Sequence, residues 1–248
     1  MTNNLLSNNI YKYSTNELTF YNWIAAKVPV VEKVRVLELG SGSGELWESL
    51  MGKFKNSQII LSDTSEERLL EARKKLHMHN FNFKVIDPHK INYNDAIFEV
   101  VIANHNLFFA KDLKMVLSEI KRVLRPGGIF ICTTNSTDHL RELSNLLENF
   151  GINSYFEKGI INTFDFENGE KKLNEYFEVV FSEKFANVLE IPDIGSILSY
   201  LRSFDDHKIN LLLQVRMMDV VKAISEQMVE KGSFTITALP SMFICLRR

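Results

Sequence analysis

The segment Val34–Gly44, with the sequence VRVLELGSGSG, constrains the fold of this chain more than any other. Its first half is an almost continuous apolar run, which is typical of a strand buried on both faces of a parallel sheet. Glycines follow at positions 40, 42 and 44, and residues 45–51 then favour a helix. A strand, a glycine turn and a helix start expose backbone N–H groups beside the positive end of a helix. We therefore expect a polar or charged ligand to bind here.

The glycine pattern narrows the choice of ligand. The dinucleotide fingerprint G-x-G-x-x-G needs glycine or alanine at position 45, where Glu45 stands instead. The phosphate-binding P-loop ends in Gly-Lys-Ser/Thr, a sequence that this chain lacks. An acidic residue, Glu38, ends the strand before the glycines. The pattern disfavours an NAD-dependent oxidoreductase, which we keep as an alternative.

A second predicted strand, residues 59–63, also ends in an acid, Asp63. Asp63 lies 23 residues beyond Gly40, close to the spacing at which a carboxylate meets a ribose in nucleotide-binding βαβ units. One carboxylate can accept hydrogen bonds from both ribose hydroxyls. The alternative is that Asp63 caps the next helix, but residues 64–67 resemble a capping box of their own. We favour the ribose role.

Two more predicted strands, 83–86 and 98–103, end in polar residues. The first precedes Asp87-Pro88, which can accept a hydrogen bond from a ligand amine or simply form a turn. The second precedes Asn104-His105-Asn106, and it is followed by an amphipathic helix, an Arg-Pro-Gly-Gly turn and a fifth strand over 129–133. Alternating strands and helices predict an α/β fold, whose parallel strand ends share one ligand-binding edge.

These features resemble class I S-adenosylmethionine-dependent methyltransferases, in particular small bacterial methyltransferase-domain proteins. Glu38-x-Gly40-x-Gly42-x-Gly44 is similar to their first motif, and the stretch 98–133 carries the most specific likeness. The resemblance covers 34–135 well and most of the remaining chain more loosely. It implies a Rossmann-like, doubly wound, seven-stranded sheet that is mostly parallel. An antiparallel last strand, 242–246, would lie beside the fifth, and helical additions would cover the site.

The same resemblance implies S-adenosyl-L-methionine as cofactor. Its methionine part would lie over the glycines, its ribose at Asp63 and its adenine near Asp87. Tyr13 belongs to a segment that closes over the cofactor in one bacterial branch; the alternative is a surface tyrosine beside a helix cap. The expected cofactor-binding residues are Tyr13, Glu38, Gly40, Ser41, Gly42, Gly44, Asp63, Thr64, Asp87, Pro88, Asn104 and His105.

Two histidines are candidate catalytic residues. A base is needed only if the methyl acceptor arrives protonated, and an unperturbed histidine, with a pKa near 6.5, suits that task. His105 follows the fourth strand, beside the expected methyl position, and is the first choice. His139, in the segment after the fifth strand, is the second. The alternatives are that His105 packs against the adenine and that His139 is an exposed residue of a helix start.

We expect a single methyltransferase domain over 1–248. Residues 1–30 would form an N-terminal helical cap, 34–135 the cofactor-binding core, and 136–248 acceptor-side helices and final strands. We interpret 179–189 as a sixth strand and 194–204 and 209–229 as helices. The last helix carries an apolar stripe that we assign to the core: Leu212, Val215, Met218, Val221 and Met228.

Composition limits the partners. A net charge of −2 disfavours a protein built to bind nucleic acid. Cys132 and Cys245 each lie in an apolar run, which indicates reduced, buried thiols in a cytoplasmic protein. We find no apolar run of the roughly 18 residues that a membrane span needs, no signal-peptide pattern and no metal-ligand spacing. We expect neither a membrane nor a metal partner, and a monomer or homodimer.

The sequence thus predicts a methyltransferase acting on a small molecule or a biosynthetic peptide. It does not distinguish O-, N- or C-methylation. The alternatives from other classes are an NAD-dependent oxidoreductase and a non-catalytic S-adenosylmethionine-binding module.

Overall fold

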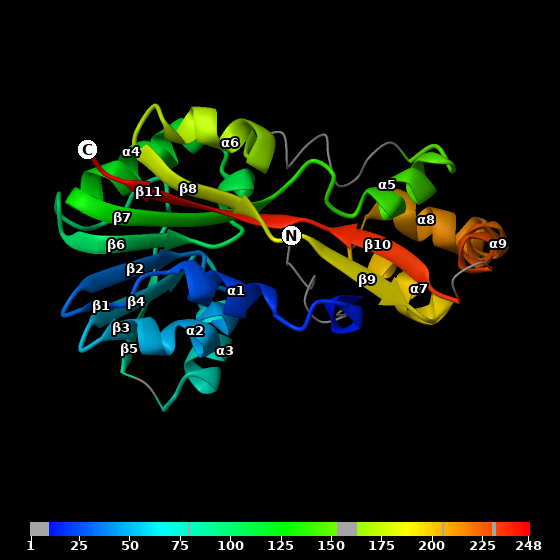
Figure 1. Cartoon of the computed structure of the whole chain (residues 1–248), viewed down its shortest axis with the longest axis horizontal. Helices are drawn as coiled ribbons and strands as arrows, with labels where there is room; N and C mark the ends of the chain where they lie inside the picture. Colours follow the sequence, from blue (N-terminus) through cyan, green and yellow to red (C-terminus); the bar gives the residue numbers. More distant parts are fainter. Residues whose placement is uncertain (1–9, 79, 153–162, 205, 230–231) are drawn as a thin grey trace. The chain divides into compact units, whose positions relative to one another are not determined.

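A computed structural model describes residues 10–78, 80–152, 163–204, 206–229 and 232–248 (Figure 1). They fall into two compact units, each with its own hydrophobic core. The large unit comprises Leu18–Thr137, Ile160–Phe185 and Pro240–Arg248. The small unit comprises Met1–Glu17, Asp138–Gly159 and Ala186–Leu239. The expected single domain, with helices over the acceptor site, stays a prediction.

The large unit is built on a seven-stranded sheet, which confirms the predicted fold class. The strands lie in the order β5 (Phe81–Val85), β4 (Gln58–Asp63), β2 (Arg35–Leu39), β6 (Phe98–Ala103), β7 (Leu124–Asn135), β11 (Pro240–Leu246) and β8 (Glu178–Lys184). The first five pair in parallel, and β11 is antiparallel to both of its neighbours. The last strand therefore lies beside the predicted fifth strand. Cys132 and Cys245 are consequently on neighbouring strands, where both are buried and free.

The central strand β2 shows how sequence alternation builds two cores. Leu37 and Leu39 point to one face of the sheet, where α4 (Leu113–Val123) and α6 (Phe166–Leu173) pack. Val36 points to the other face, toward α1 (Phe20–Lys27) and α2 (Glu45–Leu50). Glu38 shares that second face, because its carboxylate contacts Trp47 of α2. The strand is apolar on both sides, as the sequence predicted, with one acid on the α2 side.

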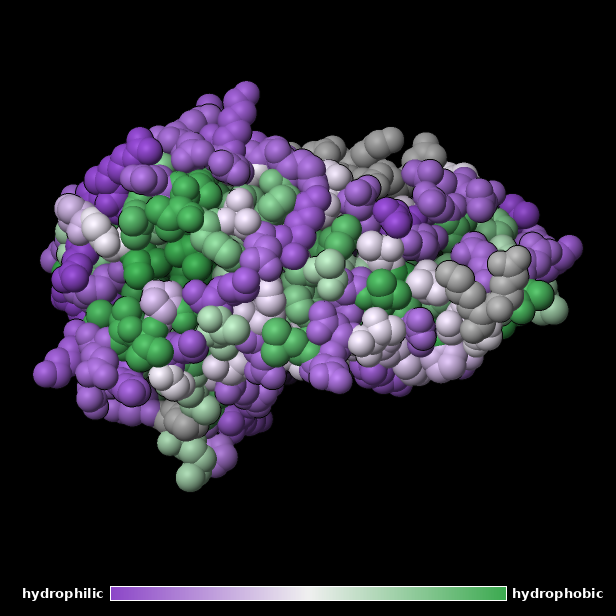
Figure 2. Space-filling view, in the orientation of Figure 1, coloured by the Kyte–Doolittle hydropathy of each residue, from purple (hydrophilic) through white to green (hydrophobic). Residues whose placement is uncertain are grey.

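Short elements and caps complete the large unit. α3 (Glu66–Lys75) begins at Ser65, whose side chain accepts a hydrogen bond from the backbone N–H of Arg68. Asp112 caps α4 in the same way. The remaining elements are β1 (Val31–Glu32), β3 (Phe54–Lys55), η3 (Met51–Lys53) and η4 (Leu107–Phe109). Figure 2 shows apolar residues at the surface over β8 and β11, where Phe181 and Ile244 are partly exposed.

The small unit combines a two-stranded sheet with helices. Strand β9 (Asn187–Ile191) pairs antiparallel with β10 (Phe234–Ala238). The other elements are η2 (Ile10–Tyr13), α5 (Arg141–Glu148), α7 (Ile194–Arg202), α8 (His207–Val215) and α9 (Met217–Met228). One face of each packs into a core that includes Leu143, Ile197 and Ile236.

Two expectations about this part of the chain are wrong. The stretch 179–189 is not one strand: it divides into β8 and β9, which belong to different units. The stretch 209–229 is not one helix, because the helical conformation is interrupted at Arg216, between α8 and α9. The break changes which residues face inward, so Val215 and Met218 of the predicted core stripe are 72% and 78% exposed.

Two searches of the described residues bear on partners. None of the described helices has the length and apolar character that a membrane span requires. Within the same ranges, no group of three or more His, Cys, Asp or Glu side chains could hold a metal ion.

Candidate cofactor and active site

The predicted glycine loop follows β2 directly. Gly40, Gly42 and Gly44 have φ angles of 67°, 57° and 84°, in the left-handed region that favours glycine. The backbone N–H of Ser41 donates to the carbonyl of Ser62 at 2.8 Å, which ties the loop to the end of β4. The three glycines are therefore required by the backbone path itself.

The glycines differ in what surrounds them. A Cβ atom on Gly40 would lie 2.5 Å from Nδ2 of Asn106, and one on Gly44 would lie 2.7 Å from Leu76. A Cβ on Gly42 would meet no atom within 4 Å. Gly40 and Gly44 thus serve close packing, whereas Gly42 borders open space. The open space at Gly42 leaves room for a ligand, and the binding of the cofactor's methionine part at this loop stays a prediction.

Asp63 ends β4 beside this loop and is buried. Its Oδ2 accepts a hydrogen bond from the backbone N–H of Gly42 at 3.0 Å, and its Oδ1 accepts one from Ser65 at 2.9 Å. Helix α3 has its own cap, Ser65, so Asp63 is not needed as one. Each carboxylate oxygen can accept a second hydrogen bond, which leaves acceptors for ribose hydroxyls. The neighbouring Thr64 is exposed.

Glu38 of β2, two residues before Gly40, is 1% exposed. Its Oε2 accepts a hydrogen bond from Nε1 of Trp47 at 2.5 Å. Burial raises the pKa of Glu38 to about 8, the bond from Trp47 opposes the rise, and the nearby carboxylates of Glu45 and Asp63 add to it. At neutral pH this side chain is mostly a neutral carboxylic acid. Ser41, also in the loop, has a buried hydroxyl without a hydrogen-bond partner among the described residues.

Asp87 follows β5 and is exposed. Its Oδ1 accepts hydrogen bonds from the backbone N–H of His89 at 2.9 Å and from the His89 ring at 2.8 Å. These two bonds lower the pKa of Asp87, and the bond from the backbone N–H has the larger effect. The pair Asp87-Pro88 therefore forms a turn, as the alternative expectation held. Its Oδ2 has no hydrogen-bond partner within the described ranges and stays open to a ligand amine.

The end of β6 is held by a small polar network. Thr133 of β7 donates its hydroxyl proton to Oδ1 of Asn104 at 2.6 Å and accepts the backbone N–H of His105 at 2.9 Å. His105 has a φ of 49°, an unusual value for a bulky residue. The strain places Asn106 against the glycine loop, where its amide nitrogen donates to the carbonyl of Leu39.

His105 faces aromatic neighbours. Its ring centroid lies 5.3 Å from that of Phe20 in α1 and 6.2 Å from that of Phe108. Burial lowers the pKa of His105 to about 4, instead of the unperturbed value near 6.5 on which the sequence interpretation relied. The sequence interpretation missed Phe20, Thr133 and Asn106 as neighbours of this site. Asn106 carried a signal, since it stands in the polar strand end; Phe20 carried none.

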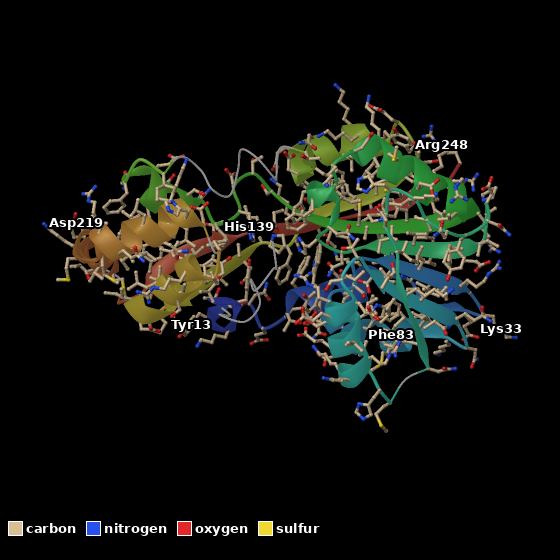
Figure 3. All side chains as sticks on the ribbon, turned by 180° about the vertical axis from the view of Figure 1, so that it is seen from behind. Tyr13, Lys33, Phe83, His139, Asp219 and Arg248 are labelled. Carbon is tan, nitrogen blue, oxygen red and sulfur yellow. The ribbon has the colours of Figure 1, made fainter. Side chains whose placement is uncertain are left out.

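Tyr13 and His139 belong to the small unit (Figure 3), so their relation to the glycine loop stays a prediction. The Tyr13 hydroxyl donates to Oδ2 of Asp193 at 2.9 Å. His139 is buried; its Nδ1 accepts the backbone N–H of Leu239 at 2.9 Å, and its Nε2 lies 3.1 Å from the hydroxyl of Tyr11. Because Nδ1 accepts, the ring is neutral with its proton on Nε2. Both nitrogens are thus engaged in structural contacts.

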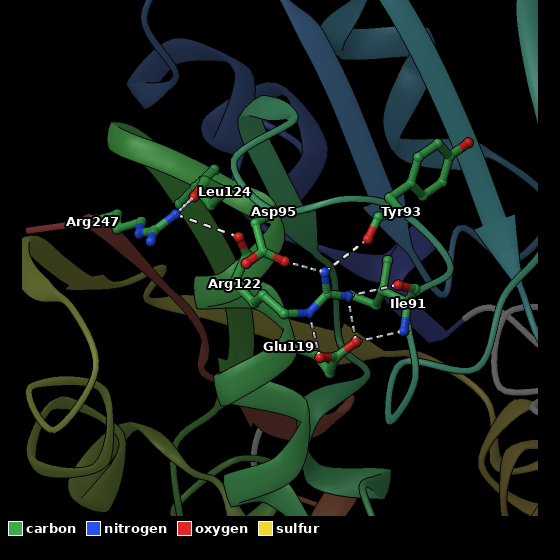
Figure 4. A network of polar contacts seen from close by, with 7 residues as sticks. All are labelled: Ile91, Tyr93, Asp95, Glu119, Arg122, Leu124 and Arg247. Carbon is green, nitrogen blue, oxygen red and sulfur yellow. Dashed lines mark hydrogen bonds and ion pairs between the residues drawn. The ribbon is translucent and has the colours of Figure 1, made fainter.

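Another hollow of the large unit lies away from the glycine loop. It has a volume of about 840 Å³ and is lined by residues of 89–94 and of α4. Arg122 at its wall is fully paired: it binds Glu119 and Asp95 at 2.7–2.8 Å and donates to the carbonyls of Tyr93 and Ile91 (Figure 4). Its polar groups hold the loop after β5 onto α4. The ligand site at the glycine loop stays a prediction.

Comparison with known proteins identifies a domain and several relatives. A family model described as a methyltransferase domain matches residues 37–132, from β2 to β7. The ubiquinone/menaquinone biosynthesis C-methyltransferase UbiE of Desulfotalea psychrophila is 30% identical over 126 residues, which are 51% of this chain and 49% of that protein. Malonyl-[acyl-carrier protein] O-methyltransferase 2 of Ilyobacter polytropus is 24% identical over 194 residues, 73% of each chain.

The chain thus spans about half the length of the first of these relatives. Among solved structures, phosphoethanolamine N-methyltransferase 2 of Haemonchus contortus, in complex with S-adenosyl-L-methionine, has the same fold. The two structures superpose with a TM-score of 0.55 and share 19% sequence identity, and the match covers 91% of this chain and 52% of the other protein's chain. The methyltransferase match implies S-adenosyl-L-methionine as cofactor. Residues 37–132 thus match a methyltransferase domain, and these relatives support the resemblance to the class I S-adenosylmethionine-dependent methyltransferases.

Proposed function

We propose that this protein transfers a methyl group from S-adenosyl-L-methionine to a small molecule or a biosynthetic peptide. The named relatives support methylation at carbon or oxygen, since one is a C-methyltransferase of quinone biosynthesis and another an O-methyltransferase of malonyl-[acyl-carrier protein]. An intermediate of a biosynthetic pathway, free or attached to a carrier, is the acceptor class that this support favours.

One observation carries the proposal: the polar groups follow the strand order along one edge of the sheet. Asp87 follows β5, Asp63 follows β4, the glycine loop follows β2, and Asn104-His105 follow β6. Adenine, ribose and methionine are joined in that same order in the cofactor. Strand ends of parallel sheets are also where such folds bind ligands. We therefore assign Asp87 to the adenine, Asp63 to the ribose and the loop to the methionine part.

The chain's own residues would act mainly by orientation. The bound cofactor supplies an activated methyl group on a sulfonium. The rings of Phe20, His105 and Phe108 form an apolar wall at the end of β6 that would exclude water and align the acceptor. Orientation of this kind can contribute roughly 7–11 kcal/mol.

His105 stays the proposed proton acceptor, but its lowered pKa makes it a weak base. With a pKa of about 4 it is neutral at pH 7 and free to accept a proton, but it holds that proton weakly. It suits an acceptor whose proton is acidic, such as an enol, better than an ammonium or an alcohol, and a carboxylic acid, already ionised at pH 7, needs no base. A carboxylic acid is the acceptor group of an O-methyl ester, and an activated carbon is that of a C-methyl product.

The proposal can be tested with labelled methyl donor. The purified chain is incubated with methyl-labelled S-adenosyl-L-methionine and a panel of phenols, quinol precursors and acyl-carrier thioesters, and labelled product and S-adenosylhomocysteine are both measured. We expect labelled product with at least one acceptor. Tight binding of the donor without transfer to any acceptor would favour the non-catalytic module, and binding of NAD⁺ instead of the donor would favour the oxidoreductase.

A further inference from the structure

The buried carboxylate of Glu38 has an unusual set of neighbours. Its strand partners are Leu61 of β4 and Ile102 of β6, both buried and apolar. Trp47 gives it one hydrogen bond, to Oε2. Within the described residues no donor reaches Oε1, and no lysine or arginine pairs with either oxygen. A carboxylate in this position would lack the partners that buried charges normally have.

The charged groups around Glu38 make ionisation harder. Glu45, at the start of α2, and Asp63, at the end of β4, both act on it with negative charge. Glu45 itself binds Ser43 and lies 3.9 Å from Nζ of Lys75 in α3, which also lies 3.5 Å from Glu48. Lys75 is thus engaged at the surface by two other acids. The residue opposite Glu38 on the neighbouring strand β6 is Ile102, which carries no charge.

We propose that Glu38 is protonated in the free protein and exchanges its proton for the ammonium group of the cofactor. This inference rests on the proposed function, because it needs S-adenosyl-L-methionine or S-adenosylhomocysteine at the glycine loop. In the free protein the neutral acid avoids an unpaired buried charge. When the ligand binds, Glu38 loses its proton to solvent, and the carboxylate pairs with the ammonium. Charge balances, since one cation replaces another.

The hydrogen bonds of the two acids beside the loop differ. Asp63 accepts hydrogen bonds from two backbone N–H groups. Glu38 accepts a single indole N–H. Its Oε1 has no hydrogen-bond partner among the described residues, and the ammonium of the ligand would supply one.

Calorimetric proton counting tests the proposal. S-Adenosylhomocysteine is titrated into the protein at pH 7 in phosphate, imidazole and Tris, whose ionisation enthalpies differ, and the dependence of the observed enthalpy on the buffer gives the number of protons released. We expect close to one proton released by the wild type. We expect none from Glu38→Gln, which keeps an acceptor for Trp47 and the size of the side chain. Circular dichroism checks that the variant is folded.

A ligand control makes the result independent of the variant. 5′-Methylthioadenosine lacks the ammonium, so its binding to the wild type should release no proton. Wild-type affinity for S-adenosylhomocysteine should rise up to tenfold per pH unit between pH 6 and 7. Release near zero with S-adenosylhomocysteine, or equal release with the two ligands, would overturn the proposal while leaving the proposed function intact. Failure of the wild type to bind S-adenosylhomocysteine or the methyl donor would overturn both.

Discussion

Replacing Glu38 by glutamine should stabilise the ligand-free protein at alkaline pH. The pKa of Glu38 rises from 4.5 to about 8 on folding, mainly through burial. In the unfolded chain the side chain ionises above about pH 4.5, whereas in the folded protein it stays protonated up to about pH 8. Wild-type stability is therefore lost progressively between these two pH values. Glutamine never ionises, so the variant escapes that loss.

The magnitude follows from the size of the pKa shift. Each pKa unit corresponds to about 1.36 kcal/mol, so the ceiling is roughly 4–5 kcal/mol above pH 8. Water penetration and relaxation reduce this, and we expect about 3 kcal/mol at pH 8 and below about 1 kcal/mol at pH 5. Urea unfolding of both proteins at pH 5, 6, 7 and 8, followed by circular dichroism, measures the difference.

Glu99→Gln is a matched control, for which we expect a stability change of the opposite sign. Glu99, on the neighbouring strand β6, is also mostly buried, but the backbone N–H and guanidinium of Arg35 and the charge of Arg125 outweigh burial and lower its pKa. Its contribution is present above the unfolded pKa and is lost as pH falls, so Glu99→Gln should destabilise the protein at pH 7–8. A Glu38→Gln variant no more stable than wild type at pH 8, with Glu99→Gln behaving as expected, would refute the reasoning about Glu38.

Three further predictions concern other residues. Gly42→Val should abolish S-adenosyl-L-methionine binding in a titration and, because φ is 57°, lower unfolding stability by about 1–2 kcal/mol; a variant that binds normally would move the ligand elsewhere. His105→Ala should lower kcat by about 10²-fold, and wild-type kcat should not fall with the histidine until pH approaches 4; a loss centred near pH 6.5 would contradict the lowered pKa. Arg122→Met should lower the free energy of unfolding by about 1–2 kcal/mol in urea, because the partly exposed Glu119 and two backbone carbonyls lose their hydrogen-bond donor. Unchanged binding of S-adenosyl-L-methionine by this variant would confirm that the hollow between 89–94 and α4 is not the cofactor site.

The sheet could be predicted because its signals are local. The apolar run of β2, the glycines after it and the acid that ends β4 each lie within a few residues of the element they define. The division of 179–189 could not be predicted, because β8 and β9 continue the same alternation and only long-range pairing, to β11 and β10, separates them. The break at Arg216 has no proline or glycine to mark it.

The sequence predicts which candidate residues lie at strand ends. It predicts less well the properties that depend on tertiary contacts. The positions of Glu38, Gly42 and Asp63 follow from the motif. The unusual pKa values of Glu38 and His105 do not, because they depend on burial by side chains from other elements, such as Trp47 and Phe20. For the same reason, the engagement of both His139 nitrogens was not visible in the sequence.

We expect the edge formed by β5, β4 and β2 to bind S-adenosyl-L-methionine, and calorimetric titration of that ligand measures this binding directly. We expect one site per chain in the wild type. We expect Asp63→Ala to weaken binding by about 1–3 kcal/mol, the range for removing hydrogen bonds to a charged group. Asp112→Ala, which removes the cap of α4, serves as the matched control and should bind like the wild type. No binding by the wild type, or an affinity of Asp63→Ala unchanged within about twofold, would contradict the account.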